Sequence, residues 1–147
     1  RDPLSVSRFE IVDDHQISLS GPARPGEYIG ATGPLSAWLG FENGTGEVWV
    51  HPLKIARELR LAFKIPEYSN PIPGQNVARW VETRPEVQTI TYSHATFQVK
   101  QHVLAPRDRP GILLLLEVDA VRELDIHVES LGAELIPRAR FIELLKT

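Results

Sequence analysis

The sequence predicts an all-β fold, an antiparallel β-sandwich of about 10–12 short strands. Three observations carry this prediction. Several segments alternate between apolar and polar residues with the period of two that is typical of half-buried strands. These segments recur at intervals of about 8–12 residues and are separated by turn residues. The chain also contains 12 prolines and 10 glycines, which divide it into pieces too short for long helices.

The clearest alternating strand begins at Phe97. Its apolar residues share one parity and its polar residues share the other: Phe97, Val99 and Val103 against Gln98, Lys100 and His102. A period of two over seven residues predicts one buried face and one face in contact with water.

The next predicted strand, Ile112 to Val118, is apolar on both parities. It follows a connection from Ala105 to Gly111 that is dense in turn residues. A run of this kind predicts an internal strand that is buried on both faces. A buried helix is also apolar all round, but this run is short and has no helix cap. For a buried Leu114, replacement by alanine is expected to cost roughly 2–5 kcal/mol.

Asn43-Gly44 marks a hairpin turn between two further strands, because both residues accept a positive φ. The same residues begin the sequence Asn43-Gly44-Thr45, which is also an N-glycosylation motif. That motif is common by chance, so the turn is the preferred interpretation.

Residues Lys54 to Ile65 allow either a helix or a strand. Ile55, Leu59, Ala62 and Phe63 would share one helix face, but from Glu58 onward the charged and apolar residues alternate. A helix would spread the large apolar residues over more than half its circumference. We therefore predict a strand.

The remaining segments are assigned by the same reasoning. The expected strands are Ser5 to Ile11, Ile17 to Ser20, Tyr28 to Ala31, a short piece at Trp38-Leu39, Glu47 to Val50, Val77 to Thr83 and Leu124 to Val128. Residues Gly21 to Gly26 and Pro66 to Gln75 are expected to be loops. Arg138 to Thr147 is expected to form a short C-terminal helix or another strand.

Length and composition indicate one ordinary globular domain, a single β-sandwich over residues 1–147 that belongs to a longer or multidomain protein. The chain begins at Arg1 and lacks methionine, which predicts processing or excision from something longer; a removed secretory signal is one explanation. A net charge of −3 gives no reason to expect nucleic acid or an anionic membrane as partner. Without cysteine there are no disulfides and no thiolate metal sites.

The sequence contains no recognisable catalytic residue set and no signal for a cofactor. It has no glycine-rich phosphate loop, no GxSxG and no HExxH. Nothing indicates that His94 and His102 converge on a metal, and a turn explains Asp13-Asp14-His15 as well as a cation site does. The prediction is therefore no catalytic residue, no metal and no cofactor.

Two tryptophans are the candidate carbohydrate-binding residues. Trp49 shares its parity with Glu47 and His51, and Trp80 shares its parity with Glu82 and Arg84. An indole on the polar face of a strand can stack on a sugar ring or cover a neighbouring domain. The alternative is that both pack under loops or between layers.

Three stretches together resemble a known family: GEYIGATGPLSAWLGFENGTGEVWVHPLKI, ARWVETRPE and TITYSHATFQVKQHVLAPRDRPGILLLLEVD. They are similar to the N-terminal β-sandwich of bacterial six-hairpin glycosidases, the glucoamylase-like and glycogen-debranching-like enzymes. The resemblance spans about Glu27 to Asp119, and its matched features are structural. It implies a non-catalytic module, secreted or periplasmic in many relatives, that braces a helical (α/α) catalytic barrel in the same or a separate chain and helps shape its sugar cleft.

The hypothesis from the sequence is therefore an accessory β-sandwich of a carbohydrate-active enzyme. Its partners would be the helical barrel and an oligosaccharide, without nucleic acid or membrane. A free-standing carbohydrate-binding module is one alternative, and a purely structural or protein-interaction sandwich is another. An exposed apolar face would favour bracing, whereas a shallow groove with an open tryptophan would favour saccharide binding.

Overall fold

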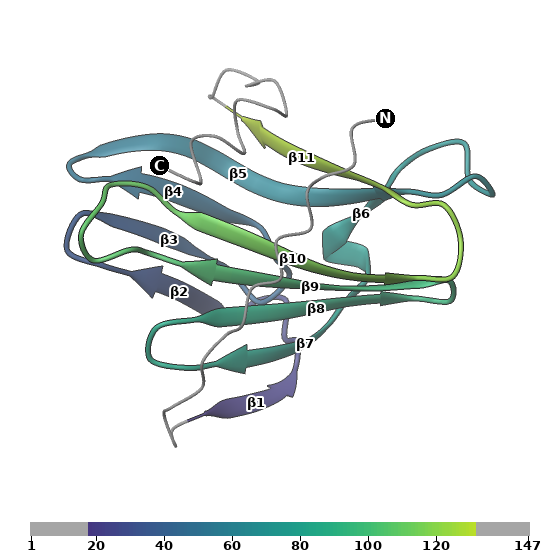
Figure 1. Cartoon of the computed structure of the whole chain (residues 1–147), viewed down its shortest axis with the longest axis horizontal. Helices are drawn as coiled ribbons and strands as arrows, with labels where there is room; N and C mark the ends of the chain where they lie inside the picture. The colour runs from purple at the N-terminus through teal and green to yellow at the C-terminus, as the bar shows by residue number, and fades with distance from the viewer. Residues whose placement is uncertain (1–17, 132–147) are drawn as a thin grey trace.

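The computed structural model describes residues 18–131, which form two antiparallel sheets packed face to face (Figure 1). The all-β sandwich predicted from the sequence is confirmed. Eleven strands lie in this described range. The five-stranded sheet has the order β1-β7-β8-β9-β10, with bounds Leu19–Pro22, Ala78–Thr83, Gln88–His94, Phe97–Leu104 and Leu113–Ala120. The six-stranded sheet has the order β11-β5-β4-β3-β2, with bounds Asp125–Leu131, Leu53–Lys64, Gly46–Val50, Ser36–Phe41 and Tyr28–Thr32, and β6 (Ile72–Pro73) pairs with β5.

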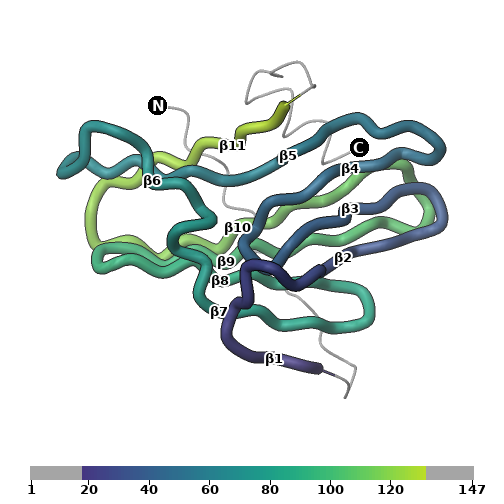
Figure 2. Tube along the Cα trace, turned by 180° about the vertical axis from the view of Figure 1, so that it is seen from behind, coloured from purple at the N-terminus to yellow at the C-terminus, as the bar shows by residue number. Residues whose placement is uncertain are grey.

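Each sheet is built mainly from consecutive hairpins. Strands β2 to β5 follow one another in the six-stranded sheet, and β7 to β10 follow one another in the five-stranded sheet. A single 3₁₀ turn, Gly74–Asn76, lies between β6 and β7. The five-stranded sheet is nearer the viewer in Figure 1, and the six-stranded sheet is nearer in Figure 2.

The core lies between the two sheets and contains the apolar parity of each strand. Phe97, Val99 and Val103 are buried, as the alternation predicts. Aromatic contacts join the layers, because the Phe63 ring of β5 lies 5.0 Å from the Phe97 centroid and 5.2 Å from that of Tyr92. Burial raises the pKa of the Tyr92 hydroxyl, which donates to Gln101 Oε1 at 3.1 Å. That hydrogen bond satisfies two polar groups that the core would otherwise leave unpaired.

Trp38 is a core residue, fully buried on β3. Its indole needs the space that two glycines leave on β3 and β4. A Cβ on Gly46 would lie 2.6 Å from Trp38 Nε1, and a Cβ on Gly40 would lie 2.9 Å from Trp38 Cζ2. The glycines are therefore a packing requirement at these two positions.

The predicted hairpin at Asn43-Gly44 is confirmed, and it joins β3 to β4. Gly44 has φ of 93°, and Asn43 Oδ1 accepts a hydrogen bond from the Thr45 amide at 2.9 Å. A Cβ on Gly44 would overlap the Tyr92 hydroxyl, so this turn packs closely on the opposite sheet.

The strand predicted over Lys54 to Ile65 is confirmed as β5. The mixed pattern of this segment has a physical cause, a β-bulge at Arg57-Glu58-Leu59. There, the pairing of β5 with both β4 and β11 shifts register, and Glu58 adopts φ of 51°. The extra residue changes the parity of the strand, which explains why the apolar positions before and after Glu58 do not follow one alternation.

The prediction of Ile112 to Val118 as an internal strand is wrong for the described part of the chain. Within residues 18–131, β10 hydrogen-bonds only to β9 and forms the end of its sheet. Leu114 and Leu116 pack against the core and are half-buried, while Val118 is exposed. Among the described residues, β10 is thus apolar on both parities although only one strand pairs with it.

Gly21 and Pro22 belong to β1, although a loop was expected there; Pro22 is compatible with an edge strand, which needs fewer amide donors. The expected strand at Ser5 to Ile11 and the expected helix or strand at Arg138 to Thr147 lie outside the described residues, as does Asp13-Asp14-His15.

Candidate saccharide-binding face

The candidate site lies on the outer face of the five-stranded sheet, the face turned away from the core. The pairing register places side chains of neighbouring strands in rows across this face. One row runs through Pro22, Trp80, Thr91, Lys100 and Glu117, and the next runs through Ser20, Glu82, Thr89, His102 and Leu115. Residues from five separate segments of the chain therefore meet on one surface.

A shallow hollow of about 330 Å³ opens on this face, over β7, β8 and β9. We call it the β7–β9 hollow, and its lining residues are Trp80, Glu82, Thr89, Thr91, Gln98 and Lys100. Its volume lies at the low end of the ~300–1,000 Å³ that small-molecule sites occupy. One aromatic side chain and five polar ones line it, a composition suited to a ligand that has an apolar ring face and polar substituents.

Trp80 is 46% exposed and forms the aromatic part of the hollow. It lies on β7 opposite Thr91, on the outward parity, while its neighbour Val81 is buried in the core. The alternation of β7 thus holds the indole out of the core, where about half of its surface is accessible to a ligand.

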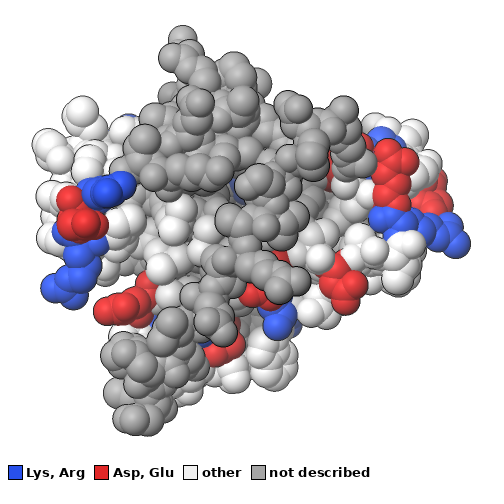
Figure 3. Space-filling model, in the orientation of Figure 1, with Lys and Arg blue, Asp and Glu red and all other residues white. Residues whose placement is uncertain are grey.

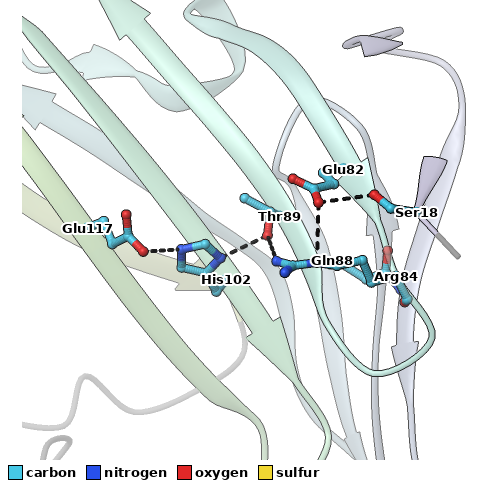
Figure 4. Close-up of polar contacts among 7 residues, drawn as sticks. All are labelled: Ser18, Glu82, Arg84, Gln88, Thr89, His102 and Glu117. Carbon is cyan, nitrogen blue, oxygen red and sulfur yellow. Dashed lines mark hydrogen bonds and ion pairs between the residues drawn. The ribbon is translucent and has the colours of Figure 1, made fainter. Parts of the chain in front are cut away.

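A polar chain borders the hollow and is centred on His102 (Figure 4). His102 Nε2 lies 3.0 Å from Glu117 Oε1, and Nδ1 lies 2.8 Å from Thr89 Oγ1. Arg84 Nη2 donates to the same Thr89 oxygen at 3.1 Å. The side chains therefore link β8, β9 and β10 across the face.

Burial favours the neutral form of this histidine. Desolvation lowers the pKa of His102, and the positive charges of Arg84 and Lys100 act in the same direction; the hydrogen bond and charge of Glu117 oppose them. For a neutral ring, one tautomer fits these two contacts: Nε2–H donates to Glu117, and Nδ1 accepts from the Thr89 hydroxyl. The Thr89 oxygen then accepts from Arg84 Nη2, so both roles of the Thr89 hydroxyl are filled.

The one carboxylate that lines the hollow, Glu82, is held from the other side. Ser18 Oγ donates to Glu82 Oε1 at 3.1 Å, and Arg84 Nε lies 3.5 Å from the same oxygen. Gln88 Nε2 in turn donates to the Arg84 carbonyl at 3.0 Å. These contacts place Arg84 between Glu82 and Thr89 and fix the polar edge of the hollow (Figure 4).

Trp49 lies elsewhere, on the outer face of the six-stranded sheet. It is half-buried, its Nε1 donates to Glu47 Oε1 at 2.9 Å, and Lys54 Nζ lies 5.2 Å from its ring centroid. Lys54 also pairs with Glu47 at 2.9 Å, and the hydrogen bonds from Lys54 and Trp49 hold the pKa of Glu47 below its ordinary value. The structure does not bring the two predicted tryptophans together, and the cation beside Trp49 occupies one of its ring faces.

The two histidines considered as metal ligands also do not converge. His94 lies on the inward parity of β8 and stacks on Phe97, with centroids 5.2 Å apart, whereas His102 lies on the outward parity of β9. Among the described residues no group of three or more His, Asp, Glu or Cys side chains could hold a metal ion.

Sequence reasoning missed four lining residues: Thr89, Thr91, Gln98 and Lys100. The alternation of β9 did assign Gln98 and Lys100 to a polar face, but parity within one strand does not tell which strand lies beside it. His102 was assigned to the same wetted face, and this assignment is wrong in one respect: the residue faces outward yet is only 4% exposed.

Acidic and basic side chains are interspersed among the described residues on the face seen in Figure 3. Within residues 18–131, no helix has the length and hydrophobicity needed to span a bilayer. Comparisons of the chain with protein-family models, with curated proteins and with solved structures find no match.

Proposed function

We propose that this chain is a non-catalytic accessory β-sandwich of a glycoside hydrolase, and that its β7–β9 hollow contacts saccharide. The observation that carries the proposal is the half-exposed Trp80 indole beside Glu82, Thr91, Gln98 and Lys100. Sugar rings present C–H faces that suit an aromatic surface, and their hydroxyls need polar partners around the rim. In the hollow, Trp80 offers the aromatic surface and the side chains around it offer the polar partners.

Such a surface is expected to bind weakly. One sugar on one indole, in an open hollow, supports at best a millimolar dissociation constant, about −4 kcal/mol. An affinity of this size is useful when a tethered catalytic domain benefits from a raised local concentration of substrate. A weak binding module thus suits a chain tethered to a catalytic domain. From the family resemblance, that domain would be a helical barrel in a secreted or periplasmic enzyme.

A second surface favours the bracing part of this role. Tyr28 and Phe41 stack with centroids 5.0 Å apart on the outer face of the six-stranded sheet, and they are 81% and 37% exposed. Leu39 lies on the same parity of β3 and is also exposed. Exposed apolar clusters of this kind are typical of surfaces that contact another domain. Thus one face supports ligand contact and the other supports attachment to a neighbour.

The test is a titration of the 147-residue chain with a panel of soluble oligosaccharides, followed by tryptophan fluorescence and by calorimetry. Trp80→Ala is expected to abolish binding, because it removes the stacking surface. Trp49→Ala is the matched control, since it removes an outward-facing indole from the other sheet and is expected to leave the affinity unchanged.

Two results would contradict the proposal. One is binding that survives in Trp80→Ala with unchanged affinity. The other is the absence of binding to every saccharide in the panel at millimolar concentration. An unchanged thermal unfolding temperature in Trp80→Ala would show that the loss of binding is local and that the fold is intact.

A further inference from the structure

The free polar groups of the β7–β9 hollow indicate which class of saccharide it takes, an inference that rests on the proposed function. Within the described part of the chain, the Lys100 ammonium has neither a hydrogen bond nor an ion pair. Lys100 lies directly opposite Glu117 in the β9–β10 register, where an ion pair would be expected. Glu117 instead accepts from His102 Nε2 at 3.0 Å. The Lys100 ammonium therefore makes no direct ion pair with the Glu117 carboxylate beside it.

Two acceptor atoms at the edge of the hollow, in contrast, already have partners. Glu82 Oε1 receives the Ser18 hydroxyl and lies 3.5 Å from Arg84 Nε. Thr89 Oγ1 accepts from Arg84 Nη2, and its own hydrogen goes to His102 Nδ1 in the neutral tautomer. A polar group of the hollow that lacks a partner among the described residues is thus the Lys100 ammonium, on the same strand face as the exposed Gln98 amide.

The unpaired ammonium discriminates between ligands. A neutral sugar offers it only uncharged hydroxyl oxygens. A carboxylate brings no hydrogen and accepts several bonds, and the bonds it receives from an ammonium are charge-assisted.

The geometry of the row permits both contacts at once. Trp80, Thr91 and Lys100 are register partners on β7, β8 and β9. Two strand spacings of ~4.8 Å separate the Trp80 and Lys100 backbones by about 10 Å. A pyranose ring over Thr91 can therefore stack on the indole and direct a ring substituent toward the ammonium.

We infer that the β7–β9 hollow binds a saccharide that carries a carboxylate, as a uronic acid residue does. Its ring stacks on Trp80, and its carboxylate accepts from Lys100 and Gln98. Of the acidic side chains beside the hollow, Glu82 lies against Arg84 and Glu117 is bonded to His102, so both are held by other partners than Lys100. Lys100 is the residue that determines the preference.

The experiment compares one saccharide in two charge states. The 147-residue chain is titrated with an oligogalacturonide and with the same oligomer fully methyl-esterified, at low ionic strength. The free acid is expected to bind about fivefold more tightly, the upper range for a partly exposed ion pair. The advantage decreases as salt is added.

Three variants assign the effect to Lys100. Lys100→Gln is expected to bind both forms equally, and Lys100→Arg is expected to keep the preference for the acid. Lys54→Gln, which removes a lysine from the outer face of the other sheet, is expected to behave as the parent does.

The outcomes separate this inference from the proposed function. Equal affinity for acid and ester, with both lost in Trp80→Ala, would overturn the acidic preference and leave saccharide binding intact. Binding of the acid that persists in Trp80→Ala would overturn both. A sulfated neutral oligosaccharide that binds more tightly than the uronide would overturn the assignment to a carboxylate.

Discussion

His102 and Glu117 are joined across β9 and β10 by a contact of 3.0 Å between Nε2 and Oε1, on the outer face of the sheet. The two residues differ in environment, because the His102 side chain is 5% exposed and that of Glu117 is 52% exposed. A surface carboxylate thus anchors a buried imidazole, and the Thr89 hydroxyl holds the other ring nitrogen. Burial favours the neutral ring and the Glu117 carboxylate favours the protonated one; burial prevails, because the pKa of His102 is lowered.

The first prediction is a histidine contribution to the pH dependence of stability. Because the pKa of His102 is lowered in the folded state, the unfolded chain binds the proton more readily. The stabilisation from the neutral ring is complete above the ordinary histidine pKa of about 6.5, and it decreases as pH falls from there toward the lower folded value. Urea unfolding at several pH values between about 7.5 and 4.5 measures this pH dependence of the unfolding free energy.

His102→Gln removes this titration and is expected to flatten the curve over that interval. His127→Gln is the control, since His127 is exposed on β11. Identical pH dependence in the parent and in His102→Gln would contradict the assignment.

The second prediction concerns the glycines around Trp38. Gly46→Ala is expected to destabilise the fold by about 1–3 kcal/mol, because the new Cβ would lie 2.6 Å from Trp38 Nε1 and force a core rearrangement. Gly30→Ala, on β2 in the same sheet, is the matched control. Its Cβ would meet its nearest atoms at 3.4 Å, an ordinary contact, so little change is expected. Chemical denaturation measures the unfolding free energy of both variants. Equal stability in the two would contradict the packing argument.

The strands could be predicted from sequence because the alternation within each strand shows which of its faces is buried. The alternation from Phe97 to Val103 gave the buried parity, and Asn43-Gly44 gave the turn. The pairing partners could not be predicted, because parity within β9 says nothing about β8 or β7. The hollow depends on that pairing, so Trp80 was found as a single residue while Thr91 and Lys100, its register partners, were not. The register shift at Glu58 was hidden for the same reason, since a bulge is defined by the neighbouring strands.

The third prediction follows from the edge position of β10. Leu114→Ala is expected to cost less than about 2 kcal/mol, below the range for a fully buried leucine, because Leu114 is only half-buried. Phe63→Ala is expected to cost about 3–5 kcal/mol, since Phe63 is fully buried between the sheets. Comparison of the two unfolding free energies is the measurement. Leu114→Ala proving as damaging as Phe63→Ala would show that β10 is covered on both faces after all.

The last prediction is that the 147-residue chain hydrolyses no glycoside. Glycosidases place two carboxyl groups about 5–5.5 Å apart when they retain configuration, or about 6.5–9.5 Å apart when they invert it. Glu82 on β7 and Glu117 on β10 flank the hollow. Three strand spacings of ~4.8 Å separate the backbones of their strands by about 14 Å. Each also has a partner already, Ser18 for Glu82 and His102 for Glu117.

The assay uses starch-type and aryl-glycoside substrates with the purified chain, and Glu82→Gln and Glu117→Gln are purified in parallel. We expect the three proteins to give the same background rate. Turnover by the parent that disappears in either variant would make this face catalytic and overturn the accessory role.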